Sequence, residues 1–319
     1  IFAICILSLI STRGMMITAT LFLFQLFYHF RLQYTIKKIL IRTLSFAPGI
    51  LLAGSFLLYH YVQKGWVGYH ADMPWASCFE EISSLSEFFR NFLVLGLRLL
   101  DFGRFFVWIL LLTLVFFYIK PKKIKQAIAP KEQGIVVLLV CLFIIFSYTV
   151  LFHKMLSGYR YLMPLYFLIS LFTFILTAKQ LEEKRLQVLA IVISIFLLAG
   201  NFIPHPKKMS VGWDATLAHI PYYELREKAL NYIDENNIPQ KQIVTGFCLY
   251  GKQTYIDLKN DSLEFYSYTK INTANYFLFS NVSNLEDEIV DELESKNWKE
   301  LKAFRKGNVE IILYQRIKP

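Results

Sequence analysis

The amino-acid sequence predicts an α-helical polytopic membrane domain followed by a small extracytoplasmic α/β domain. Of the 319 residues, 55% are hydrophobic and only 18% are charged, which is too apolar for an ordinary soluble protein of this length. Long apolar runs separated by short charged stretches extend to Pro204, whereas the sequence from His205 onward has the composition of a globular domain. The basic residues also gather between the apolar runs. We therefore predict a transmembrane domain at residues 1–204 and a soluble domain at residues 205–319.

The apolar runs are long enough to be membrane spans, because a bilayer core of about 30 Å needs roughly 20 residues of helix. On this criterion the sequence predicts about seven spans, at residues 1–10 (cut short), 15–30, 40–61, 93–119, 135–153, 159–178 and 187–203. The chain opens at Ile1 inside an apolar run, without an initiator Met or a preceding basic segment. We expect it to be an N-terminally truncated part of a longer protein.

Basic residues follow the second, fourth and sixth predicted spans, and they predict the orientation. They are Arg31, Lys37, Lys38 and Arg42, then Lys120, Lys122, Lys123, Lys125 and Lys131, then Lys179, Lys184 and Arg185. By the positive-inside rule these segments face the cytoplasm. The loops at 11–14, 62–92 and 154–158 and the domain at 205–319 are then extracytoplasmic.

The net charge of +10 also belongs to the membrane part. Residues 1–204 hold 19 Lys and Arg against 8 Asp and Glu, a net charge of +11, so the remainder carries −1. Nucleic-acid binding would need a basic face on the folded domain. We therefore expect no nucleic-acid partner.

The soluble domain shows alternating strand and helix patterns. Periodicity predicts helices at 222–235 and 285–296 and strands at 242–247, 275–280 and 309–316, which together imply a small sheet with helices packed against it. In the long loop before the fourth span, residues 83–90 are predicted to form a short helix on the membrane surface.

Charged residues inside a span are candidates for function because burying them in a membrane costs several kcal/mol. Arg98, Asp101 and Arg104 lie in the outer half of the predicted fourth span. Asp101 and Arg104, at i and i+3, are expected to pair on one helical face. Two interpretations stay open: a functional site, or a buried clamp with Arg98 reaching the interface.

A second group of candidates surrounds the loop between the fifth and sixth spans. It comprises His153, Lys154, Tyr159, Arg160 and Tyr161, followed by Pro164. A planar guanidinium such as that of Arg160 suits bidentate phosphate binding, and Lys154 can add a point charge. Arg13, in the first outer turn, could join this anion site. The alternative is that these cations contact lipid headgroups one by one.

The sequence gives little sign of a metal site. His70 and Asp72 have a spacing that suits two ligands, but a third is not in view. Cys5, Cys78, Cys141 and Cys248 have no paired spacing. No metal ligands are assigned, and a divalent metal ion is left open as a cofactor.

Four segments together resemble the C-type membrane glycosyltransferases, in particular bacterial relatives of protein O-mannosyltransferases and of the aminoarabinose transferase. They are Tyr-Arg-Tyr-Leu-Met-Pro at 159–164, Gly-Tyr-His-Ala-Asp-Met-Pro-Trp at 68–75, Arg-Leu-Leu-Asp-Phe-Gly-Arg at 98–104 and Trp-Asp-Ala-Thr-Leu-Ala-His at 213–219. The similarity covers most of the chain through short motifs. The family's Arg-Tyr-x-x-Pro pattern matches at Arg160, Tyr161 and Pro164, but a second proline frequent in relatives is Phe167 here.

The resemblance implies transfer of a sugar from a polyprenyl-phosphate donor to an extracytoplasmic lipid, glycan or protein. It also implies an acidic residue on an early outer loop that acts as general base or orients the acceptor, in a region that we expect this chain to lack. Charge that develops on the leaving phosphate must be met by preorganised donors. Arg160 with Lys154 or His153 are the first candidates for that role, and Arg98 or Arg104 the second. His70, Asp72 and Asp101 are expected to line the acceptor side.

Two other classes of function stay open. A transporter or flippase for a lipid-linked or anionic solute would use the charged residues to line a passage, but the sequence shows neither an internal repeat nor paired broken helices. A membrane anchor for a sensing domain would leave those charges without a purpose.

Overall fold

The computed structural model describes residues 1–70, 76–118, 130–154, 156–203, 205–212, 216–247, 249–253, 264–283 and 285–317. The chain divides into two compact units, Ile1–Phe196 and Leu197–Pro319. The division falls inside the last long helix of the first unit. The sequence places the boundary several residues later, at Pro204.

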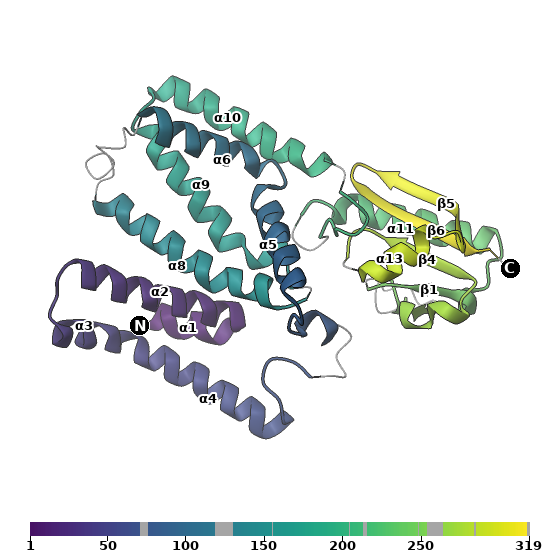
Figure 1. Ribbon diagram of the computed structural model, residues 1–319, viewed down its shortest axis with the longest axis horizontal. Coiled ribbons are helices and arrows are strands. Elements are labelled where there is room, and N and C mark those ends of the chain that lie inside the picture. Colours follow the sequence, from purple (N-terminus) through teal and green to yellow (C-terminus); the bar gives the residue numbers. More distant parts are fainter. Residues whose placement is uncertain are drawn as a thin grey trace. The chain divides into compact units, whose positions relative to one another are not determined.

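The first unit is built of helices (Figure 1). They are α1 (Phe2–Ile10), α2 (Thr12–Arg31), α3 (Ile36–Thr43), α4 (Ala47–Lys64), α5 (Leu85–Leu100), α6 (Arg104–Thr113), α8 (Pro130–Phe152), α9 (Met163–Ala178) and α10 (Glu183–Ala199). A 3₁₀ turn at Tyr159–Tyr161 precedes α9, and a π-helical turn at Leu114–Tyr118 follows α6.

Three helices among the described residues are long and apolar enough to cross a membrane. They are Ile36–Lys64, which joins α3 to α4, Glu132–Phe152 in α8, and Glu183–Phe202, which includes α10. A fourth span results if α5 and α6 are counted as one bent helix. In Glu183–Phe202 only 6% of the apolar window is buried within the chain, so its apolar surface faces outward, as a lipid-facing helix requires.

The described helices thus support three or four spans by length and composition, fewer than the seven expected from the sequence. α1 has 9 residues and α9 has 16, and at 1.5 Å per residue 16 residues extend only about 24 Å. α2 has 20 residues, but Arg13, His29 and Arg31 lower its hydropathy.

The expectation of one continuous helix over residues 93–119 is wrong. α5 and α6 meet at an angle of 84° (Figure 1). Between them Phe102 and Gly103 have φ values of 52° and 75°, a left-handed conformation that ends a right-handed helix. Asp101 and Arg104 therefore lie on opposite sides of a break, and the predicted i, i+3 pairing on one helical face is wrong as well.

The start of α5 also differs from the prediction. The expected surface helix at 83–90 and the expected start of a span at residue 93 belong to one helix that begins at Leu85. The Ser84 side chain accepts a hydrogen bond from the Glu87 backbone N–H at 3.2 Å, and the Glu87 carboxylate accepts one from the Ser83 N–H at 2.6 Å. This reciprocal capping starts the helix well before the apolar run begins.

The turn between α1 and α2 is unusually tight. The Cα of Gly14 approaches α1 so closely that a Cβ there would lie 1.9 Å from the carbonyl oxygen of Leu7. The buried hydroxyl groups of Ser8 and Thr18 are hydrogen bonded across the same interface at 3.1 Å. Glycine at residue 14 and two small hydroxyl residues thus allow α1 and α2 to pack backbone against backbone.

The second unit contains a six-stranded mixed sheet with the strand order β2-β3-β1-β4-β6-β5. The strands are β1 (Ile243–Thr245), β2 (Gly251–Lys252), β3 (Glu264–Ser267), β4 (Tyr276–Ser280), β5 (Trp298–Lys306) and β6 (Val309–Arg316). β1 is parallel to both β3 and β4, whereas β4–β6, β5–β6 and β2–β3 are antiparallel. The predicted strands at 242–247, 275–280 and 309–316 are confirmed as β1, β4 and β6.

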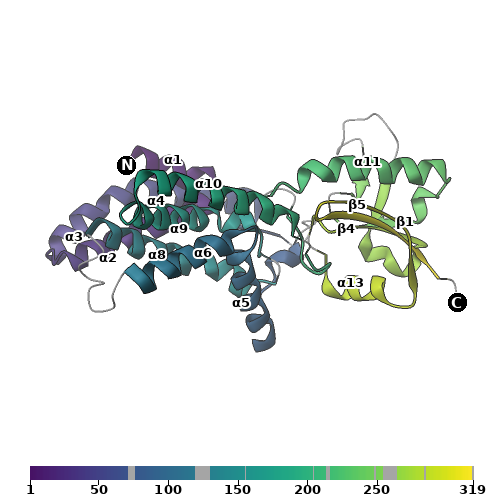
Figure 2. The ribbon, with the colours of Figure 1, turned by 90° about the horizontal axis from the view of Figure 1, so that it is seen from above.

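Helices cover both faces of this sheet. Figure 2 shows α11 (His219–Glu235) on one side and α13 (Asp287–Glu294) on the other. Side chains of β6 alternate between the two cores, and Ile312 and Tyr314 pack in the core that also contains Val290 and Leu293 of α13. The predicted helices at 222–235 and 285–296 are therefore confirmed, and together with the sheet they confirm a small α/β domain.

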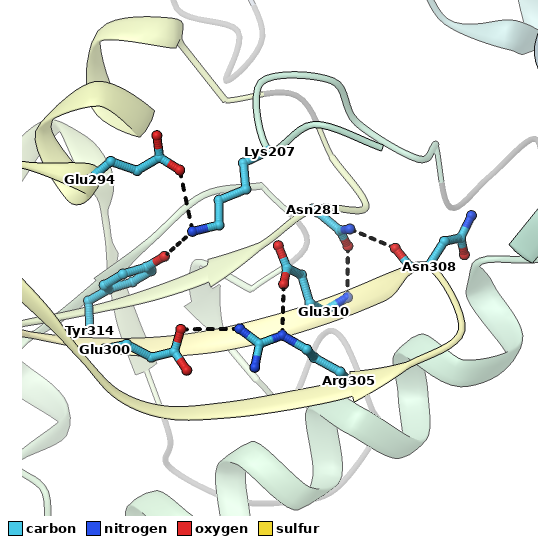
Figure 3. A network of polar contacts seen from close by, with 8 residues as sticks. All are labelled: Lys207, Asn281, Glu294, Glu300, Arg305, Asn308, Glu310 and Tyr314. Carbon is cyan, nitrogen blue, oxygen red and sulfur yellow. Dashed lines mark hydrogen bonds and ion pairs between the residues drawn. The ribbon is translucent and has the colours of Figure 1, made fainter. Parts of the chain in front are cut away.

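The segment that enters this unit is fixed to the sheet by polar contacts (Figure 3). The Lys207 ammonium donates to the Tyr314 hydroxyl at 2.9 Å and lies 3.4 Å from a Glu294 carboxylate oxygen. Burial alone would lower the pKa of Lys207, but these two hydrogen bonds outweigh burial and raise it. The side chain thus stays charged while it is half-buried.

A buried asparagine ties β4 to the β5–β6 hairpin (Figure 3). The Asn281 amide nitrogen donates to the Asn308 carbonyl at 2.8 Å, and its oxygen accepts from the Glu310 N–H at 3.0 Å. Both ends of the amide are used by backbone groups that would otherwise be unsatisfied near the hairpin turn.

The ionisation of Glu224 makes the stability of this unit depend on pH. Hydrogen bonds to Lys228 and Lys306 lower the pKa of the Glu224 carboxyl group from 4.5 to about 2. Because the folded-state pKa is the lower one, the stabilisation is present above the unfolded pKa and is lost as the pH falls toward about 2. In an NMR titration, Lys306→Ala is expected to raise the pKa of Glu224, whereas Lys299→Ala is not. An unchanged pKa in Lys306→Ala would contradict this assignment.

Candidate functional site

Two clusters contain most of the residues that the sequence identifies as candidates, and the 3₁₀ turn Tyr159–Tyr161 contributes a tyrosine to each. The inner cluster comprises Arg98, Asp101, Arg104, Tyr159 and Tyr166. The outer cluster comprises Arg13, Arg160 and Tyr161. Both clusters belong to the helical unit.

The inner cluster forms at the break between α5 and α6. Arg98 is almost fully buried and its guanidinium carbon lies 4.0 Å from the centre of the Tyr159 ring. The guanidinium carbon of Arg104 lies 4.0 Å from the centre of the Tyr166 ring. Each arginine thus rests on a tyrosine face, a cation–π arrangement that is strongest where water is excluded.

The helix break explains why these side chains are held there. A helix that ends leaves its last carbonyl groups without helical partners. The carbonyl oxygen of Arg98 accepts hydrogen bonds from Arg104 Nη2 at 3.0 Å and from the Tyr166 hydroxyl at 2.9 Å. The Leu99 carbonyl accepts one from the indole of Trp108 at 3.1 Å. Side chains of α6 and α9 therefore complete the end of α5.

Asp101 supplies the carboxylate of the inner cluster. Its Oδ1 accepts a hydrogen bond from the Phe102 N–H at 2.8 Å, and its Oδ2 accepts a short one from the Tyr159 hydroxyl. The Phe102 ring packs edge-on against Tyr159 with centroids 4.7 Å apart. The carboxylate therefore fixes both the left-handed turn after α5 and the position of Tyr159.

The outer cluster brings together two arginines that are far apart in the sequence. The guanidinium carbon of Arg13, in the first turn of α2, lies 4.6 Å from the centre of the Tyr161 ring. That of Arg160 lies 5.5 Å from the same centre. A Cβ on Gly158 would lie 3.1 Å from the Tyr161 ring, so the glycine leaves room for the tyrosine at this turn.

His153 forms an isolated antiparallel β-bridge with residue 81, and Lys154 follows it in the chain. The Lys154 ammonium forms an ion pair with Glu80 at 2.6 Å, and Asn91 donates to the His153 carbonyl at 3.0 Å. His153 Nδ1 is 3.2 Å from the Thr149 carbonyl. The positive charge of Lys154 is therefore matched by Glu80, and the side chains here fasten the loop to the end of α8.

Of the residues expected on the acceptor side, the structure describes His70 and Asp101, and these two have different neighbours. The His70 ring packs against Trp66, with centroids 4.9 Å apart, and Asp101 belongs to the inner cluster. Asp72 lies outside the described residues. Among the described residues, groups of three or more His, Cys, Asp or Glu that could hold a metal ion do not occur.

Sequence reasoning missed Tyr166 and Glu80. Tyr166 lies in the apolar run of α9, and tyrosines in such runs are common at membrane interfaces. It lies in the first turn of α9, which begins at Met163, and its contact with the Arg98 carbonyl spans 68 residues of sequence. Glu80 gave no sequence signal, since its partner Lys154 is 74 residues away.

Taken together, the two clusters contain four arginines and one aspartate. Arg98 and Arg104 are buried or partly buried, and Nε of Arg104 is buried without a hydrogen-bond partner among the described residues. Excess positive charge at a partly desolvated place favours binding of an anion. Guanidinium groups match the geometry of phosphate and carboxylate groups in particular.

No protein-family model, curated protein or solved structure matches the chain.

Proposed function

We propose that this chain is part of an enzyme that transfers a sugar from a polyprenyl-phosphate donor to an extracytoplasmic lipid, glycan or protein. The observation that carries the proposal is the pair of cations on Tyr161, Arg13 and Arg160, beside the arginine-rich inner cluster. In this proposal α1, α2 and α9 also lie within the bacterial cytoplasmic membrane, and residues 205–319 lie on its periplasmic side.

The chemistry explains why such a site would be arginine-rich. The acceptor oxygen forms a bond to the anomeric carbon, the bond from that carbon to the phosphate oxygen breaks, and the acceptor proton passes to a base. Negative charge develops on the polyprenyl phosphate as it leaves, and preorganised donors lower the energy of that state. Arg13 and Arg160 would bind the phosphate, while the inner cluster would hold Tyr159 and hence the turn.

The base is not assigned to a residue of this chain. The resemblance to C-type glycosyltransferases implies that it lies on an early outer loop. The polar contacts of the C-terminal unit described above are internal ones, and the proposal assigns no chemical step to this unit.

Binding of undecaprenyl phosphate to the purified protein tests the proposal. Arg160→Gln and Arg13→Gln are each expected to weaken binding roughly 10- to 100-fold, because each removes a charge-assisted hydrogen bond. Lys64→Gln, which removes an exposed cation at the end of α4, is the matched control. Full-length protein given a polyprenyl-phosphate sugar and membranes should also release polyprenyl phosphate. If the double variant Arg13→Gln, Arg160→Gln binds undecaprenyl phosphate as tightly as the wild type, the proposal is overturned.

One observation favours the second candidate function, a transporter or flippase. The 84° break between α5 and α6 resembles the broken helices that line transporter sites, which the sequence did not predict here. Uptake of a labelled anionic solute into proteoliposomes, without release of polyprenyl phosphate from a donor, would favour this function instead.

A further inference from the structure

A second basic site lies at the other end of α2, about 24 Å along the helix from Arg13 by helical rise. An open cavity of about 510 Å³ is formed there by α2 and the start of the Ile36–Lys64 helix. It is lined by Leu21, Phe24, Gln25, Tyr28, His29, Arg42 and Phe46. Its volume is within the range of small-molecule sites, about 300–1,000 Å³.

His29 is a buried polar residue in the wall of this cavity. It is only 8% exposed, and its Nδ1 is buried without a hydrogen-bond partner among the described residues. The imidazole stacks on Tyr34, with ring centroids 5.2 Å apart. A buried nitrogen without a partner is costly, so a ligand that accepts a hydrogen bond from His29 would relieve this cost.

Two cations flank the same tyrosine. The Lys38 ammonium lies 4.2 Å and the Arg42 guanidinium carbon 4.7 Å from the centre of the Tyr34 ring. Residues 1–70 contain no Asp or Glu. Within the described part of the chain neither Lys38 nor Arg42 forms an ion pair with a carboxylate. The cavity therefore has a local positive charge that nothing in its own helices balances.

The helix that carries these cations is longer than a bilayer core is thick. Ile36–Lys64 has 29 residues and so extends about 44 Å, roughly 14 Å more than a hydrocarbon core of about 30 Å. The excess corresponds to the α3 segment, which carries Lys37, Lys38 and Arg42. With α3 as the part that extends beyond the hydrocarbon core, these side chains would lie at the level of lipid headgroups.

We propose that this cavity binds the phosphate headgroup of an acidic phospholipid. Arg42 and Lys38 would bind the phosphate and His29 would donate a hydrogen bond to it. A lipid rather than a free phosphate ester is the occupant because the walls are mostly apolar and because a further apolar groove runs along the outside of α3 and α4. That groove is about 660 Å³ and includes Ile36, Leu40, Leu44 and Ile50.

The proposal is tested with the purified full chain after delipidation, by native mass spectrometry with phosphatidylglycerol or phosphatidylcholine. We expect wild-type protein to retain phosphatidylglycerol at least tenfold more strongly than phosphatidylcholine. The double variant Lys38→Gln, Arg42→Gln should lose this preference. The double variant Lys184→Gln, Arg185→Gln should keep it, since it removes two exposed cations in the first turn of α10, outside the cavity. His29→Leu should bind roughly tenfold more weakly.

Two outcomes would overturn the proposal. Equal loss of preference in both double variants would mean that basic side chains attract acidic lipids without a built site. Equally tight binding of soluble glycerol phosphate would mean a site for a free phosphate ester. Lys38 and Arg42 are exposed, so their variants should fold even if His29→Leu does not. The Arg13 and Arg160 variants should leave this preference unchanged, which separates the site from that of the proposed transfer reaction.

Discussion

Gly14→Ala is expected to destabilise the helical unit by about 3 kcal/mol or more. The new Cβ would lie 1.9 Å from the carbonyl oxygen and 3.0 Å from the carbonyl carbon of Leu7. Both are backbone atoms, so a change of rotamer cannot remove the overlap, and α1 would have to move away from α2. Such a movement would also break the buried hydrogen bond between Ser8 and Thr18. The measurement is the apparent thermal midpoint of the detergent-purified protein.

Gly54→Ala is the matched control for this substitution. Gly54 lies inside α4, and a Cβ there would have no atom within 4 Å. Alanine is the better helix former by about 1 kcal/mol, so the midpoint should stay the same or rise. If Gly14→Ala melts at the wild-type temperature, the close approach of α1 and α2 is wrong.

The C-terminal α/β unit was the more predictable part of the fold. The predicted strand at 309–316 matches β6 because its apolar run is buried on both faces between α11 and α13. β5 was missed because Lys299, Glu300 and Lys302 interrupt its pattern. It is an edge strand of the sheet, and charged residues are common on such strands because they prevent further pairing.

The helical unit was less predictable because hydropathy records composition and not backbone direction. The run from residue 93 to 119 reads as one span, yet the left-handed residues Phe102 and Gly103 divide it. Glycine allows that conformation, but whether the chain adopts it depends on α9, whose Tyr166 satisfies the carbonyl of Arg98. Such a contact across 68 residues has no local sequence signal.

The candidate site could be predicted in its charges but not in its grouping. Charged residues in an apolar segment identified Arg98, Asp101 and Arg104. The group of cations around the loop between the fifth and sixth predicted spans identified Arg160, and Arg13 was kept as a candidate. Their division into an inner and an outer cluster depends on the turn at Tyr159–Tyr161, which directs one tyrosine to each. Lys154 was expected to add a positive charge to the anion site. The fold instead pairs it with Glu80, a contact that the sequence did not indicate.

Asp101→Ala should destabilise the helical unit by about 3 kcal/mol, because it leaves Arg98 and Arg104 without the carboxylate of the inner cluster. It also removes the acceptors of the Phe102 N–H and the Tyr159 hydroxyl. Tyr159→Phe removes only the hydroxyl and should cost about 1–2 kcal/mol. Asp101→Asn keeps an oxygen acceptor but not the charge, so its effect should lie between the two. Thermal midpoints of the three variants give this order.

Binding of undecaprenyl phosphate separates the stabilising role of Asp101 from a role in binding. Its carboxylate opposes the positive charge that attracts an anion, so Asp101→Asn should bind the phosphate as tightly as the wild type or more tightly, although it melts at a lower temperature. Arg160→Gln should bind the phosphate more weakly but melt at the wild-type temperature, since Arg160 is exposed and belongs to the outer cluster. A loss of phosphate binding in Asp101→Asn comparable to that in Arg160→Gln would contradict this division. Asp101 would then act at the ligand rather than through the turn that positions Tyr159.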